Sequence, residues 1–110
     1  LRTDFQATKE DVEYGIDHML DACEPLFIQQ TESLSSYQMN FLRALTDGVT
    51  TGFTRSEILN NYQLGTAANI SRLKKALTEK DLITLTAPKK LEISDPILAL
   101  WLKRRVWRMR

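Results

Sequence analysis

The feature that most constrains the fold is a change of hydrophobic period after the stretch TAANISRLKKALTEKD. Its apolar positions Ile70, Leu73 and Leu77 recur at helical spacing, which predicts an amphipathic helix. The next five residues, LITLT (82–86), alternate as in a strand, and LEI (91–93) alternates again after the turn APKK. The two runs predict an antiparallel hairpin that follows the helix directly.

This hairpin needs a partner, because two strands alone are only marginally stable in water. We therefore expect its apolar residues to dock against helices. The residues expected to face inward are Leu82, Ile83, Leu85 and Ile93.

Two helical segments precede the helix–hairpin pair. The segment LSSYQMNFLRALTDG offers Ser35 or Ser36 as N-cap, and it ends at Gly48, which accepts a left-handed turn. Its inward-facing residues are expected to be Met39, Phe41, Leu42 and Leu45. In the next segment Thr54 and Glu57 form a capping-box pattern, which predicts a short helix.

Both ends of the chain carry further helix signals. Thr8, followed by acidic residues, predicts the start of an N-terminal helix, and Pro25 predicts that this helix ends or kinks near residues 23–24. The apolar stripe of this helix consists of Val12, Ile16, Met19, Leu20, Cys23 and Phe27. Toward the other end, Asp95 followed by Pro96 predicts the start of a last helix.

This order of elements predicts a mainly α fold with a small two-stranded β-hairpin. Three helices followed by a two-stranded wing make a winged helix, a form of helix-turn-helix whose last helix is placed to enter the DNA major groove. Here the winged helix has an extra N-terminal helix and a C-terminal helix. We expect residues 1–34 to form an acidic helix and linker, and residues 35–110 to form the winged-helix domain with a basic C-terminal helix.

Charge is nearly balanced over the chain but unevenly distributed along it. The net charge is +1, yet residues 1–34 hold eight acidic and two basic side chains, whereas residues 35–110 hold six acidic and thirteen basic ones. The basic portion permits nucleic-acid binding without the strong charge of a dedicated binder. No apolar run approaches the roughly 20 residues of a membrane span, and the single cysteine excludes an internal disulfide. We expect a cytoplasmic protein, and the start at Leu1 rather than Met indicates a piece of a longer chain.

Two quoted segments carry a resemblance to a known family. LTEKDLI (77–83) closes the helix before the hairpin, and SDPILALWL (94–102) follows the hairpin. With these segments, residues 8–107 resemble the C-terminal winged-helix domain of prokaryotic P-loop ATPases of the AAA+ and STAND types, in which the wing commonly leads into an Asp-Pro segment that ends near a Trp. Ile97 stands where an aromatic residue is frequent. The resemblance implies that residues 8–30 correspond to the end of a helical ATPase lid.

The resemblance also implies that ATP and Mg²⁺ belong to a parent protein and that its ATPase core is a partner, within the same chain or in another protein. The sequence itself contains no G-x-x-x-x-G-K-[ST] phosphate loop. It also brings together no nucleophile, base and orienting group that could form a catalytic set. His18 and Asp21 would supply only two metal ligands. We expect no enzymatic activity, metal or cofactor in this segment.

Candidate nucleic-acid contacts lie on the predicted last helix and on the wing. Arginine and lysine can bind phosphates, and asparagine can pair with adenine. The candidates are Asn69, Arg72, Lys74, Lys75, Lys89 and Lys90. An alternative interpretation is a solvated helix face, because Ala68 offers no reading group and Glu79 repels phosphate.

The tail WLKRRVWRMR interleaves basic and aromatic residues, and its candidate contacts are Arg104, Arg105 and Arg108. Such a tail can bind nucleic acid, an anionic lipid surface or an acidic protein face. Its positive charges can also complement a helix dipole. A further interpretation pairs the tail with the acidic helix of residues 8–30, either within one chain or between two chains.

Two functional classes remain. The first is a non-catalytic regulatory or protein-interaction module of a larger AAA+-like ATPase, with weak binding to double-stranded DNA. The second is a free-standing winged-helix transcriptional regulator, which would usually bind as a dimer to paired half-sites.

Overall fold

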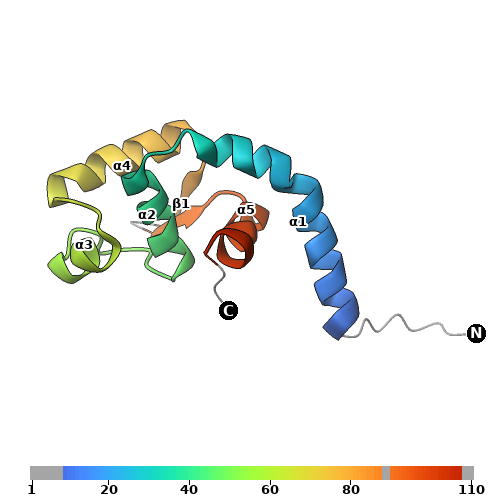
Figure 1. Cartoon of the computed structure of the whole chain (residues 1–110). Helices are drawn as coiled ribbons and strands as arrows, with labels where there is room; N and C mark the ends of the chain where they lie inside the picture. Colours follow the sequence, from blue (N-terminus) through green and yellow to red (C-terminus); the bar gives the residue numbers. More distant parts are fainter. Residues whose placement is uncertain (1–8, 88–89, 108–110) are drawn as a thin grey trace, which may run out of the picture.

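The computed structural model describes residues 9–87 and 90–107, and it has the predicted order of elements (Figure 1). The elements are α1 (Lys9–Glu32), α2 (Ser36–Thr46), α3 (Ser56–Tyr62), α4 (Ala67–Glu79), β1 (Ile83–Ala87), β2 (Lys90–Ile93), α5 (Pro96–Trp101) and a π-helical turn, η1 (Leu102–Val106). Helices α2, α3 and α4 followed by the β1–β2 hairpin constitute a winged helix, flanked by α1 and by the α5–η1 segment.

Helix α1 continues through Pro25, so the prediction that it ends near residues 23–24 is wrong. Proline lacks an amide hydrogen and weakens the helix locally. However, Leu20 before it and Phe27 after it are both buried in the common core, which holds the two parts of the helix in one element. Figure 1 shows the helix bending along its length, in agreement with the kink that was the other expected outcome. The predicted cap Thr8 lies outside the described residues.

Helix α2 begins and ends as its sequence predicts. Ser35 is the N-cap, and its hydroxyl accepts from the Gln38 amide at 3.2 Å while the Gln38 side chain accepts from the Ser35 amide at 2.9 Å. This reciprocal pair is a capping box. Gly48 follows the C-cap with φ +101°, a conformation that glycine adopts without a Cβ clash. Phe41, Leu42 and Leu45 are buried, as expected.

The capping box predicted at Thr54 and Glu57 is wrong. The N-cap of α3 is Arg55, one residue later, and no side chain caps the helix. Phe53 is buried in the core, and the Arg55 amide donates to the Gly52 carbonyl at 3.1 Å, so a turn occupies the residues where the cap was expected. Tertiary anchoring of Phe53 therefore decides where this helix starts.

The hairpin is antiparallel and pairs Ile83 with Ile93 and Leu85 with Leu91. The Leu91 amide also donates to the Thr50 carbonyl at 3.2 Å, which ties β2 to the loop after α2. Ile83 is buried as expected. Leu85 lies on the same face of the hairpin but is 61% exposed, so the prediction that it docks against the helices is wrong.

The core gathers apolar side chains from every part of the winged helix and from both flanking segments. Ile70, Leu73 and Leu77 of α4 point into it, as their spacing predicts. Helix α5 starts with Asp95, whose carboxylate accepts from the Ile97 amide at 2.9 Å, and it carries Trp101 into the same core. No helix in residues 9–87 and 90–107 combines the length and the apolarity needed to cross a bilayer.

Candidate nucleic-acid interface and ion-paired tail

The outer face of α4 presents two basic side chains to solvent. Arg72 and Lys75 lie opposite the buried stripe of the helix, together with Ala68 and Glu79, and all four are exposed. Neither Arg72 nor Lys75 has an ion-pair partner within the part of the chain that the structure describes. Two cations on the exposed face of the third helix of a helix-turn-helix are placed to contact phosphate.

Two other candidates on α4 are engaged within the domain. Asn69 is half-buried, and its side-chain amide donates to the Leu64 carbonyl at 2.9 Å, which fastens the start of α4 to the turn at Gly65. Gly65 has φ +89°, so this turn requires its freedom from a Cβ. The ammonium of Lys74 lies 5.7 Å from the centre of the Phe53 ring, within cation–π range. Asn69 therefore has a structural role, and Lys74 is directed to the flank of the helix.

At the wing, Lys90 lies on β2 and forms a surface ion pair with Glu92 at 3.8 Å. Lys89 falls outside the described residues. A partly compensated lysine retains less attraction for phosphate than Arg72 or Lys75, which leaves the outer face of α4 as the principal positive surface among the candidate positions.

The basic tail is paired with the acidic face of α1. The guanidinium of Arg104 binds both carboxylate oxygens of Glu13, at 2.5 and 3.3 Å. Arg105 donates to the Asp21 carboxylate at 2.9 Å and lies 3.6 Å from the carboxylate of Asp17. This is the arrangement that the charge-pairing interpretation predicts. Arg108 lies outside the described residues.

These contacts shift the proton affinities of both partners. The hydrogen bond and positive charge of Arg104 lower the pKa of Glu13, and the same hydrogen bond raises the pKa of Arg104. Hydrogen bonding to Asp21 raises the pKa of Arg105. Arg104 and Arg105 are consecutive residues of the π-helical turn η1, and both reach carboxylates of α1.

One buried residue anchors the same contact. The indole nitrogen of Trp101 donates to the Glu24 carboxylate at 2.7 Å, and its ring lies 5.6 Å from that of Phe27. Trp101 is buried in the core, and the sequence did not identify Glu24 as its partner. The two residues are 77 positions apart, and short-range sequence patterns cannot reveal a contact between residues so far apart in the chain.

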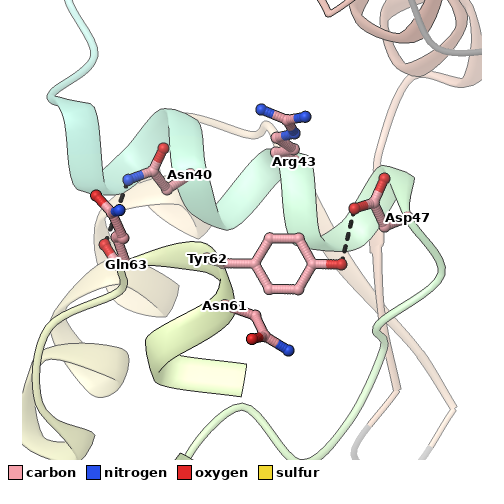
Figure 2. Close-up of a pocket in the computed structure, with 6 residues that line it drawn as sticks. All are labelled: Asn40, Arg43, Asp47, Asn61, Tyr62 and Gln63. Atoms are coloured by element: carbon pink, nitrogen blue, oxygen red, sulfur yellow. Dashed lines mark hydrogen bonds between the residues drawn. The ribbon is translucent and has the colours of Figure 1, made fainter. Parts of the chain in front are cut away.

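A polar hollow of about 530 Å³ lies between α2 and α3, and sequence reasoning also missed it (Figure 2). The Tyr62 hydroxyl donates to the Asp47 carboxylate at 2.7 Å, and the Asn40 side chain donates to the Gln63 carbonyl at 3.3 Å. Burial and the bond to Asp47 raise the pKa of Tyr62. These two bonds join the C-terminal end of α3 to α2, so they hold together the first two helices of the winged helix.

The described residues offer binding surfaces rather than a metal site. Within residues 9–87 and 90–107 no three His, Cys, Asp or Glu side chains come together as metal ligands. Cys23 is a free, half-buried thiol.

Comparison with known proteins agrees with the fold. The model of a family described as a probable winged helix domain matches residues 25–104. Searches among curated proteins and among solved structures give no significant match.

Proposed function

Because this chain belongs to the family described as a probable winged helix domain, we propose that it is a non-catalytic binding module whose α4 contacts the phosphate backbone of double-stranded DNA. The observation that carries the proposal is the exposed pair Arg72 and Lys75, which has no internal counter-ion among the described residues. In a helix-turn-helix, this helix is the one that enters the major groove.

The expected binding is weak and nearly independent of base sequence. The one amide on α4 that could pair with adenine, on Asn69, is bonded to Leu64, and Ala68 carries no polar group. Glu79, on the same face, opposes phosphate. Two phosphate contacts correspond to a slope of about −1.8 in log K against log salt concentration, which is small for a DNA-binding protein.

Fluorescence anisotropy with labelled duplexes of unrelated sequence, at low and moderate salt, tests the proposal. The Arg72→Ala, Lys75→Ala double variant is expected to lose most of the binding and most of the salt dependence. A matched control removes two positive charges elsewhere, as Lys9→Ala, Lys103→Ala. This control is expected to bind like the parent chain, since the two lysines lie on α1 and η1.

Two results would contradict the proposal. Equal loss in the double variant and in the control would mean that overall charge, and not α4, governs the binding. Tight, salt-resistant binding to one sequence would instead support the second class, a free-standing regulator that reads paired half-sites.

We also propose that the module belongs to a larger AAA+-like ATPase of a prokaryotic cytoplasm. The support is the resemblance carried by residues 94–102, in which Asp95 caps α5 and buried Trp101 bonds to Glu24 of α1. The coding sequence upstream of Leu1 tests this point. A phosphate-loop motif in the same reading frame is the expected finding, and a start codon directly before Leu1 would rule out a parent ATPase in the same chain.

A further inference from the structure

A groove of about 620 Å³ lies on the wing side of α4, away from the outer face that carries Arg72 and Lys75. It is bounded by the loop between α2 and α3, by α4 and by the hairpin. Buried Phe53 and Leu91 contribute apolar surface to its floor, and Leu85 contributes a wall. A volume of this order, within the range of about 300–1,000 Å³ typical of ligand sites, suits one or two large side chains better than a whole helix.

Leu85 is the unusual member of this lining. It is paired directly with Leu91 and therefore lies on the same face of the hairpin. Leu91 is only 8% exposed, whereas Leu85 is 61% exposed. The alternation of β1 thus places an apolar residue on the inner face of the wing, where the described part of the chain leaves it mostly uncovered. Contact with an apolar side chain from outside would bury this surface favourably.

The charge of the groove specifies what else the occupant carries. Among the described residues of its lining, Lys74 is the one charged residue, and its ammonium lies over the Phe53 ring at 5.7 Å from the ring centre. Thr51, Thr54 and Thr78 also line the groove, and their hydroxyls can donate to an anion. A site whose described lining has one cation, several hydroxyls and no carboxylate favours a negatively charged ligand group.

We propose that this groove binds a short, extended peptide segment of another protein in which a large aliphatic or aromatic residue stands next to Asp or Glu. The apolar side chain lies between Leu85 and Phe53, and the neighbouring carboxylate bonds to Lys74. A DNA backbone is a poorer occupant, because it has no large apolar side chain to cover Leu85 and Phe53, and its phosphates would lose water against a lining that is mostly apolar. The inference is independent of DNA binding by α4, since it uses a different flank of the helix.

Selection from a displayed library of short random peptides on the 110-residue chain tests the proposal. The expected consensus places an acidic residue beside a large apolar one. A labelled peptide of that consensus is then titrated by anisotropy against the parent chain, Lys74→Ala and Leu85→Ser. Both side chains are exposed, so thermal unfolding should confirm that both variants fold. Each is expected to weaken binding about tenfold, whereas Lys75→Ala, the matched control on the outer face of α4, leaves the affinity unchanged.

Several outcomes would overturn the proposal. These are a failure to enrich any peptide, a consensus without an acidic residue, or equal weakening by Lys75→Ala and Lys74→Ala. If duplex DNA displaced the peptide from the parent chain but not from Leu85→Ser, the groove would be assigned to nucleic acid. Self-association of the peptide-free chain, abolished by Leu85→Ser, would assign it to a second copy. Loss of DNA binding in Arg72→Ala, Lys75→Ala with peptide binding retained is the pattern expected if the two sites are separate.

Discussion

The two basic regions of this molecule, the tail and the outer face of α4, look alike in sequence and differ in the structure. In the tail, Arg104 and Arg105 are bonded to carboxylates of α1. On α4, Arg72 and Lys75 face solvent without internal partners in the described chain. A count of positive charges therefore overstates the surface that is open to a nucleic acid or a lipid.

The difference arises from what lies opposite each region. Helix α1 has a row of carboxylates facing the turn η1, and buried Trp101 fixes the distance between them through its bond to Glu24. Nothing in the described structure covers the outer face of α4. A basic side chain forms an ion pair only where packing places a carboxylate close to it, because the attraction weakens with distance.

The largest expected effect comes from disrupting the contact between the tail region and α1. Trp101→Ala should lower the free energy of unfolding by about 3–5 kcal/mol, because it removes a buried ring and leaves Glu24 without its donor. Denaturant unfolding measures the change. Trp107→Ala is the matched control, since Trp107 is only partly buried and should cost less. Equal losses would show that α5 is not anchored to α1 through Trp101.

The next effect concerns which cations reach DNA. Arg72→Ala, Lys75→Ala should weaken duplex binding about tenfold or more at low salt, with about one unit of salt slope lost per residue. The double variant Arg104→Gln, Arg105→Gln should leave DNA binding nearly unchanged, because both arginines already form ion pairs with carboxylates of α1. Anisotropy at several salt concentrations measures both. A larger loss in the tail variant would reverse the comparison.

A smaller effect concerns the lock between α2 and α3 that supports α4. Tyr62→Phe should cost about 0.5–1.5 kcal/mol at neutral pH through loss of the bond to Asp47. The folded state raises the Tyr62 pKa, so this stabilisation is complete below the ordinary tyrosine pKa of about 10 and is lost as pH rises through the folded value.

Urea unfolding between neutral and strongly alkaline pH checks the sign of this dependence. The parent chain should lose more stability than Tyr62→Phe as pH rises. Tyr37→Phe serves as the control on an exposed ring and should behave like the parent chain. A parent chain that gained stability at high pH relative to Tyr62→Phe would contradict the predicted role of the hydroxyl.

The smallest effect is the acid response of the tail contact. The Glu13 pKa is lowered in the fold, so its stabilisation is present above the ordinary value of 4.5 and is lost as pH falls through the folded value. Thermal unfolding from neutral to acid pH should therefore show a slightly smaller change for Glu13→Gln than for the parent chain, by at most a few degrees. Glu10→Gln, a change in the same helix, is the control. A steeper change in Glu13→Gln would argue against the pair with Arg104.

Much of the fold could be predicted because it depends on local patterns. The cap at Ser35, the turn at Gly48 and the buried stripe of α4 each follow from spacing or from backbone preferences. The helix end that was one expected outcome at Pro25 and the cap expected at Thr54 both fail for the same reason. In both places a buried neighbour, Phe27 or Phe53, overrides a preference of only a few kcal/mol.

The candidate site was less predictable, because neighbours that are distant in sequence decide whether a side chain is free to contact a ligand. The helical spacing correctly predicted the buried stripe of α4, and Arg72 and Lys75 lie on the opposite, exposed face. The same reasoning could not show that Asn69 bonds to Leu64, that Lys74 lies against Phe53, or that Leu85 stays uncovered.

The sequence by itself determined the order of helices, hairpin and final helix, since hydrophobic period and capping act over a few residues. Only the tertiary structure decided which charged side chains form ion pairs and that Leu85 stays exposed in the groove beside α4. Those outcomes depend on distances between segments such as α1 and η1, where Glu13 and Arg104 meet although 91 positions separate them.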